Sequence, residues 1–147
     1  MTSKFKNFPE FHCHINSLDS ASTLDAFVER ELELETGVIT VTDHGSMGAC
    51  REVYDAAKKN NLIPILGLES YFRDPACPIL KESGIPHDPV KDYAGYQKYF
   101  HQTFHAIDQA GYEALVREVS KADFRAEQHG SERKPLFDWN SLERLGE

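Results

Sequence analysis

The stretch that decides the fold is Val38–Phe72, with the sequence VITVTDHGSMGACREVYDAAKKNNLIPILGLESYF. It begins with a β-branched run at 38–42 and ends with a second apolar run, LIPILGLES, at 62–70. Both runs have the composition of strands, and the segment between them has that of a helix, which Ser46 can cap. A strand, a helix and a strand in this order favour parallel pairing through a right-handed crossover.

The segment upstream of this unit predicts one more strand and one more helix. FPEFHCHI at 8–15 is apolar, and strand alternation would place His12 and His14 on one face and Cys13 on the other. A helix is expected between Ser22, its cap, and Gly37, its stop. Its apolar stripe consists of Leu24, Phe27, Val28 and Leu32. The chain therefore reads as an α/β protein.

The downstream part begins with a break in the pattern. Prolines scattered among charged and small residues predict a long loop insertion at 73–97. Strand character returns at 99–107, where His101 and His105 share one face. A helix at 111–124, a polar loop and a short helix near Trp139 follow.

Composition indicates one globular domain over residues 1–147. The chain has 147 residues, 40% of them hydrophobic, and a formal net charge of −8 that argues against broad attraction to nucleic-acid phosphates. Three cysteines without a Cys-x-x-Cys pair, Cys13, Cys50 and Cys77, are expected to be free thiols in a reducing compartment. We find neither a secretion signal nor a membrane-spanning stretch, and expect a cytoplasmic protein.

Histidines and acids lie at the ends of the expected strands. They are His12 and His14, the pair Asp43 and His44, and Glu69. A His-x-His pair alone is weak evidence in a chain with seven histidines. Imidazoles and carboxylates from several strand ends, however, form the mixed nitrogen and oxygen ligand set that Zn²⁺, Mn²⁺ and Fe²⁺ accept. The pattern predicts a metal site.

Several of these residues have a second interpretation. Asp43 can cap the following turn or orient a neighbouring imidazole, and we favour this supporting role, behind the ligands, over direct ligation. Glu69 can be a solvated acid, although an apolar strand beside that of His44 favours a ligand. His101 and His105 share a face, so periodicity does not choose between them.

Other reactive residues do not suggest a different chemistry. His87 and His129 fall in expected loops and are excluded from the core site. The cysteines are interpreted as structural or incidental. Neither a Ser-His-Asp signature nor a Gly-rich phosphate loop is present. Metal-assisted hydrolysis is the better enzyme hypothesis, with a metal-activated water and no identified side-chain acid or base.

Four segments resemble the polymerase and histidinol phosphatase (PHP) domain of bacterial DNA polymerase III alpha subunits. They are FHCHINS at 11–17, the stretch 38–72, FHQTFHAIDQAGYEALVREVSKA at 100–122, and KPLFDWNSLERL at 134–145. The stretch 38–72 is the most specific, because it combines a Thr-Asp-His-Gly turn, an Ala-Ala-Lys-Lys helix end and a Pro-Ile-Leu-Gly-x-Glu strand at matching separations. The resemblance spans nearly the whole chain.

The resemblance implies a ligand set and a fold. Residues at metal-ligand positions are His12, His14, His44, Glu69 and His101, with Asp19 as a sixth. His101 is chosen over His105 by its distance from Gly111. The metal implied is zinc or manganese, with iron as an alternative. The ligand set could hold more than one ion. The implied fold is a distorted (β/α) barrel of mainly parallel strands. The family's pattern continues with a Cys segment and an Asp-x-His motif that would lie beyond Glu147. We therefore expect a partial barrel, truncated before these motifs.

The resemblance also implies a function. Family members hydrolyse phosphoesters, some polymerase members acting as metal-dependent 3′-to-5′ exonucleases and others having a structural role. We expect a phosphoesterase module acting on DNA or another phosphoester, weak or inactive alone. The alternative is a noncatalytic, metal-stabilised interaction module of a replication polymerase. Expected partners are a polymerase or a complementing chain, and no membrane.

Overall fold

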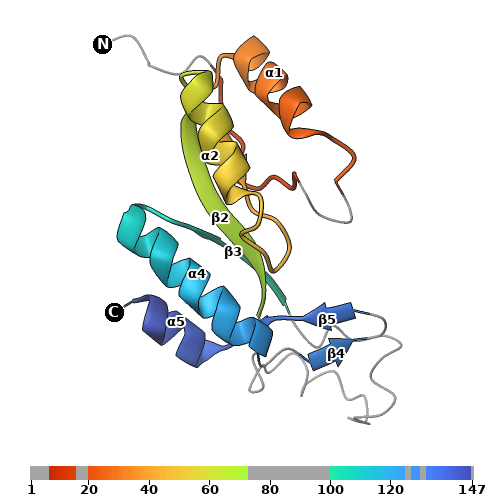
Figure 1. Cartoon of the computed structure of the whole chain (residues 1–147), viewed down its shortest axis with the longest axis vertical. Coiled ribbons are helices and arrows are strands. Elements are labelled where there is room, and N and C mark those ends of the chain that lie inside the picture. Colours follow the sequence, from red (N-terminus) through yellow and green to blue (C-terminus); the bar gives the residue numbers. More distant parts are fainter. Residues whose placement is uncertain (1–6, 16–19, 73–99, 125–126, 130–131, 147) are drawn as a thin grey trace.

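The computed structural model describes residues 7–15, 20–72, 100–124, 127–129 and 132–146 (Figure 1). The expected loop at 73–97 lies outside the described residues, as do Asp19, Cys77 and His87. In chain order the elements are α1 (Leu24–Leu34), β1 (Val38–Val41), α2 (Cys50–Lys59), β2 (Ile63–Phe72), β3 (Phe100–His105), α4 (Gln109–Phe124), β4 (Glu127–His129), β5 (Glu132–Lys134), β6 (Leu136–Phe137) and α5 (Trp139–Leu145).

The main sheet is built around β2. Its first half pairs parallel with β1, from Val38↔Ile63 to Val41↔Leu66, and its second half pairs antiparallel with β3. The short β6 pairs parallel with the last two residues of β2. The strand β3 lies along one edge of β2. The strands β1 and β6 therefore pair with the opposite edge, β1 at the beginning of β2 and β6 at its end. The predicted mixed α/β class and the mainly parallel sheet are confirmed. The predicted barrel is not confirmed, because the sheet of the described residues is open.

Two hydrophobic clusters cover the two halves of β2. The first lies among α1, α2, β1 and the N-terminal segment, and it consists of Ile15, Val28, Ile39, Val41, Ala49, Cys50, Val53, Ala57 and Leu62. The second joins the end of β2 to α4 and α5 through Leu68, Phe72, Leu115, Ala122 and Phe137. Figure 1 shows α2 along the upper part of β2 and α4 beside its lower part. The strand β2 therefore organises the whole described chain.

The segment 8–15 forms no strand, contrary to the prediction. Thr42 N donates to Cys13 O at 2.7 Å, but side chains take the place of a regular ladder. Cys13 N donates to Thr42 Oγ1 at 3.1 Å, and Ile15 N donates to the Asp43 carboxylate at 2.8 Å. Alternation nevertheless holds in the burial of the side chains, since Cys13 and Ile15 are buried whereas His12 is exposed and His14 is half-buried.

The start of each of the first two helices differs from the prediction. Thr23, not Ser22, caps α1, and its hydroxyl accepts from Ala26 N at 3.3 Å. Ser46 does not cap α2, because its hydroxyl accepts from Gly48 N at 3.0 Å and the helix begins four residues after it, at Cys50. Short polar side chains can close a local turn as readily as a helix end, and the sequence does not distinguish the two.

The apolar stripe predicted for α1 is only partly correct. Val28 is buried, and Leu24 and Phe27 pack against the first cluster. Leu32 is 45% exposed, while Glu31 is buried and accepts a hydrogen bond from the Thr36 hydroxyl. A paired polar side chain therefore occupies the inward position that the pattern assigned to leucine.

The C-terminal part contains the two expected helices and three strands that were not expected. The β4–β5 hairpin and β6 are too short to produce a periodic signal. Asp138 forms a capping box with Ser141 at the start of α5.

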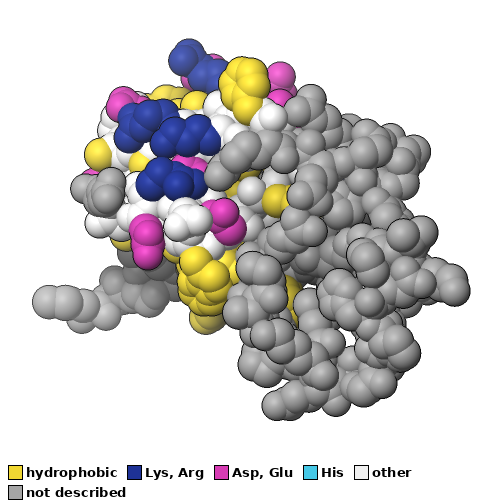
Figure 2. Space-filling model, turned by 90° about the horizontal axis from the view of Figure 1, so that it is seen from below, with side chains coloured by type: hydrophobic (Ala, Val, Ile, Leu, Met, Phe, Trp, Pro, Cys, Tyr) yellow, Lys and Arg dark blue, Asp and Glu magenta, His cyan; other side chains and the backbone are white. Residues whose placement is uncertain are grey.

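Seen from below, Lys and Arg side chains gather on one side, with hydrophobic side chains exposed beside them (Figure 2). Within the described ranges, no helix has the length and apolarity needed to cross a membrane.

Candidate metal centre

The backbone that follows β1 lies directly beside Glu69 of β2. His44 and Glu69 form an isolated parallel bridge, in which Gly45 N donates to Glu69 O at 2.7 Å and Glu69 N donates to Asp43 O at 3.0 Å. The turn is possible because Gly45 adopts a φ of +56°. Two strand-end residues predicted to meet, His44 and Glu69, are thus held side by side by main-chain hydrogen bonds.

The Glu69 carboxylate is faced by four imidazoles. One oxygen, Oε1, lies 3.2 Å from His12 Nε2 and 3.2 Å from His101 Nδ1. The other, Oε2, lies 2.5 Å from His44 Nδ1 and 3.7 Å from His14 Nε2. Each carboxylate oxygen therefore faces two potential ligand atoms, and these come from the N-terminal segment, the turn after β1 and β3.

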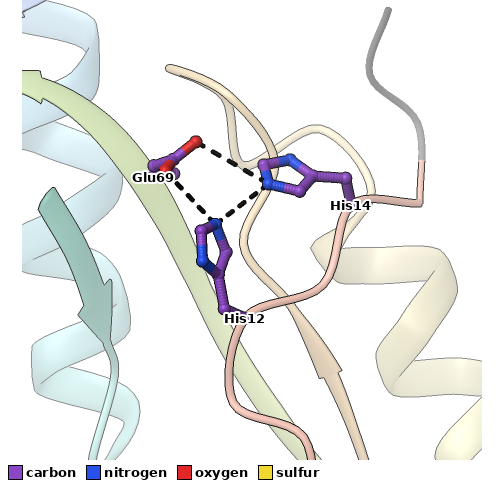
Figure 3. A group of neighbouring side chains, drawn as sticks. All are labelled: His12, His14 and Glu69. Carbon is purple, nitrogen blue, oxygen red and sulfur yellow. Dashed lines mark hydrogen bonds and ion pairs between the residues drawn. The ribbon is translucent and has the colours of Figure 1, made fainter. Parts of the chain in front are cut away.

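The four histidines and Glu69 form two groups of three that share the carboxylate. His12, His14 and Glu69 make one group, in which the two imidazole Nε2 atoms are 3.0 Å apart (Figure 3). His44, Glu69 and His101 make the other. Donor atoms bound to one tetrahedral Zn²⁺ at about 2.0–2.1 Å are about 3.3 Å apart. In the first group the two imidazole nitrogens are 3.0 Å apart and lie 3.2 Å and 3.7 Å from different oxygens of Glu69, separations close to this value.

Electrostatics also favours a cation at this place. Glu69 is 4% exposed, and its recorded ion-pair partners within the described ranges are all histidines. No contact to its buried Oε2 from the described residues has the geometry of a hydrogen bond, the 2.5 Å approach of His44 Nδ1 included. A carboxylate withdrawn from water needs compensating charge or hydrogen bonds. Imidazole nitrogens and carboxylate oxygens together suit Zn²⁺, Mn²⁺ or Fe²⁺, so the residues present fit a metal.

The candidate centre is open on one side. The side chains of His12 and His101 are 47% and 35% exposed, whereas those of His14 and His44 are 19% and 20% exposed. Solvent therefore reaches the cluster past His12 and His101.

Asp43 and His105 have distinct places beside this cluster. Asp43 is buried and accepts from Ile15 N, directly after His14, and it caps neither α1 nor α2. His105 Nε2 lies 2.7 Å from Phe11 O. The structure thus brings His101 rather than His105 to the Glu69 carboxylate, a choice that periodicity left open.

The described cysteines are poorly suited to ligation or nucleophilic attack. Burial, followed by the charges of Glu10 and Glu31, raises the pKa of the Cys13 thiol to about 12. Burial also raises the pKa of the Cys50 thiol to about 11, although its contact with Gly67 O works in the opposite direction. Both thiols stay protonated at neutral pH, and both are free, as predicted.

Sequence reasoning missed the contribution of Tyr71. Its ring stacks on His44 at a centroid distance of 5.9 Å and an angle of 12°, and it meets His101 edge-on at 5.3 Å. The signal was present in the strand period, because Tyr71 follows Glu69 by two residues and therefore shares its face. Aromatic packing of this kind restrains both imidazoles.

Comparison with known proteins adds an independent finding. The family model described as PHP domain matches residues 10–147. DNA polymerase III subunit alpha of Saccharopolyspora erythraea is 30% identical over 143 residues, which cover 88% of this chain and 12% of the relative. The alpha subunit of Aquifex aeolicus is 28% identical, and the alignment covers 97% of this chain and 12% of the relative. The alpha subunit of Thermus aquaticus is 33% identical, and the alignment covers 83% of this chain and 10% of the relative. The chain thus spans about one eighth or less of these relatives.

Proposed function

Because this chain belongs to the PHP domain family and is related to the N-terminal part of DNA polymerase III alpha subunits, we propose that it is a metal-dependent phosphoesterase module. The substrate class we propose is the 3′ end of a DNA strand, which makes the reaction a 3′-to-5′ exonuclease step. The observation that carries the proposal is the buried Glu69 carboxylate faced by four imidazoles from three segments of the chain.

The proposed ligands are the five residues that meet at this carboxylate. They are His12, His14, His44, Glu69 and His101. Asp19 is proposed as a sixth and lies outside the described residues. Zinc or manganese is the proposed metal, with iron as a chemical alternative, and the two groups of three could hold more than one ion.

The residues of the chain have separate parts in the proposed reaction. A bound divalent ion would supply a water of lowered pKa and positive charge against the phosphate. Glu69 would fix the spacing of the two groups, because its oxygens face both. Asp43 would position His14 through the amide of Ile15, and Tyr71 would restrain the ring of His44. No side-chain nucleophile is required.

A second candidate function is a metal-stabilised interaction module of a replication polymerase. It is favoured by the way the N-terminal segment is attached, since 8–15 forms no strand and is joined to the turn after β1 largely by side chains. An ion between His12, His14 and Glu69 would clip this segment to β2, and binding energy of that kind adds directly to folding stability. A module of this kind would gain stability from zinc without hydrolysing DNA.

Hydrolysis of a 3′-labelled single strand with Mn²⁺ or Zn²⁺ distinguishes the two functions. We expect slow, metal-dependent release of the label that is lost in His101→Ala. The matched control is His105→Ala, which removes an imidazole from the same strand face but not from the carboxylate. Equal rates in the two folded variants would refute the site. Zinc-dependent thermal stabilisation without any release of label would support the interaction module instead.

A further inference from the structure

A lysine lies at the edge of the histidine cluster. Lys134 Nζ is 4.4 Å from the centroid of the Tyr71 ring and 3.3 Å from its hydroxyl. The same ring stacks on His44 and meets His101 edge-on. The ammonium of Lys134 therefore contacts the same aromatic ring as two proposed ligands, His44 and His101.

The backbone determines this position. Residues 134–135 lead directly into β6, which pairs with β2 at Tyr71↔Leu136. On the other side, Pro135 packs against the turn that carries His44, since a Cβ on Gly45 would lie 2.9 Å from Pro135 Cγ. Lys134 is thus held between the turn after β1 and the end of β2, the two elements that supply His44 and Glu69.

The charge of the whole chain makes this placement informative. Acidic residues outnumber Lys and Arg by 24 to 16, so the chain as a whole does not attract phosphates. A lysine ammonium binds phosphate oxygens as a compact point charge, and an aromatic ring beneath it keeps the flexible side chain in place. Lys134 and Tyr71 together have the chemistry of a phosphate-binding group beside the proposed metal centre.

We infer that Lys134 binds and positions the phosphate of the phosphoester substrate, with Tyr71 holding its side chain over the cluster. This inference rests on the proposed function, because it places the phosphate next to the proposed metal ligands. Lys134 acts by contact with a non-bridging phosphate oxygen. It takes no proton and forms no bond to phosphorus.

The competing explanation is that Lys134 only packs on an aromatic ring. The chain supplies a matched control for it, because Lys58 Nζ lies 5.4 Å from the centroid of the Tyr54 ring on α2. This second lysine makes the same type of contact without any proposed ligand beside it. A Lys58→Met variant therefore measures the loss of a cation–π contact alone.

The test compares Lys134→Met, Lys134→Arg and Lys58→Met with the unaltered chain, all loaded with zinc. Calorimetric titration with inorganic phosphate gives the affinity, and metal analysis gives the zinc content. We expect Lys134→Met to bind phosphate about tenfold more weakly or worse, which is typical of a lost charge-assisted hydrogen bond. Lys134→Arg should keep affinity within a few-fold, and Lys58→Met should match the unaltered chain. The zinc content should be the same in all four proteins.

A kinetic readout separates positioning from a structural role. The KM for a 3′-labelled strand should rise in Lys134→Met while kcat changes little, because a phosphate contact present before and during the reaction contributes uniform binding. Lys134→Gln replaces the methionine variant if urea unfolding shows that the latter does not fold. In either variant, phosphate affinity equal to that of the unaltered chain would overturn the inference.

The outcome also separates this inference from the proposed function. An unaltered chain that takes up zinc but binds no phosphate would refute the role of Lys134 and leave the metal centre intact. A chain that takes up no metal would refute the proposed function, as read from metal analysis, and the inference with it. Phosphate binding lost equally in Lys134→Met and Lys58→Met would mean a general charge effect and would also refute the role.

Discussion

At the scale of single residues, the turn after β1 is held by several contacts at once. Asp43 accepts from Ile15 N, His44 faces the carboxylate of Glu69, and Gly45 adopts a left-handed backbone. Consecutive residues thus fix the N-terminal segment, a proposed ligand and the direction of the chain. Small changes here should affect both stability and the site.

Gly45→Ala should destabilise the fold by about 2 kcal/mol, because alanine adopts a positive φ poorly and its Cβ would meet a packed proline. The φ of Gly45 is +56°, and the built Cβ lies 2.9 Å from Pro135 Cγ and 3.0 Å from Tyr71 Cε2. Urea unfolding measures the effect. Gly111→Ala in α4 is the control, since its nearest contact would be 3.5 Å and alanine favours a helix. Equal stability of the two variants would contradict this account.

At the scale of elements, the N-terminal segment and α5 are both attached by buried polar contacts in addition to their apolar ones. The segment 8–15 is attached through Thr42 and Asp43. The short helix α5 is attached to α4 through Glu118, which is 2% exposed and accepts from Arg144 Nε at 2.8 Å and from its Nη2. Removal of one partner leaves a buried polar group unsatisfied, and such losses are large.

Asp43→Ala should weaken zinc binding by about tenfold or more, although Asp43 is not a proposed ligand, because groups that orient ligands affect affinity on this scale. The Ile15 amide would lose its acceptor, and the segment with His12 and His14 would be less well placed. Competition with a chromogenic chelator gives the affinity. Asp55→Ala, which removes an exposed carboxylate paired with Arg51, should leave it unchanged. Unaltered zinc affinity in a folded Asp43→Ala protein would argue against a positioning role.

Arg144→Met should cost about 3 kcal/mol at pH 7, because it leaves the buried Glu118 carboxylate without its main partner. Burial of Glu118 opposes its charge, but hydrogen bonds from Arg144 and Ser141 outweigh burial and hold the pKa of the carboxyl below its ordinary value. The control is Arg51→Met, whose exposed pair with Asp55 should leave the free energy of unfolding nearly unchanged.

The depressed pKa of Glu118 also fixes the pH dependence. A carboxyl whose pKa is lower in the folded state stabilises the fold above its unfolded pKa of about 4.3, and this contribution disappears as pH falls through the folded value. Acidification below about pH 4 should therefore destabilise the unaltered chain more than Arg144→Met. Urea midpoints at pH 7 and below pH 4 measure the difference. A constant gap between the two proteins would contradict the ionic role of Glu118.

How much of these elements the sequence could predict depends on their length and regularity. The unit Val38–Phe72 was predicted correctly because β-branched runs and a helix of ten residues give strong periodic signals. The strand at 8–15 was wrong because its amides bond to side chains that periodicity does not consider. The meeting of His12, His14, His44 and Glu69 could be expected from strand ends, and Tyr71 could have been found from its spacing of two residues from Glu69. The place of Lys134 required the register of β2 and β6.

At the scale of the whole molecule, the histidine cluster lies where three separate segments converge on the second half of β2. One hydrophobic cluster packs on the first half of that strand and the other on its end, and the strand is continuous through both. We propose that the chain is one domain for this reason. The rigid strand then keeps Glu69 and Tyr71 in a fixed relation, while His44 and His101 come from the elements paired with β2, the turn after β1 and β3.

The most direct measurement is the metal content of the folded chain and of Glu69→Gln after equilibration with zinc or manganese and removal of free ions. Glutamine keeps the shape of the side chain but removes the charge that both groups of three share. We expect at least one ion per unaltered chain and a large loss in Glu69→Gln, with the far-ultraviolet circular dichroism of the two proteins unchanged. Equal metal content in both folded proteins, or none in the unaltered chain, would contradict a metal centre built on Glu69.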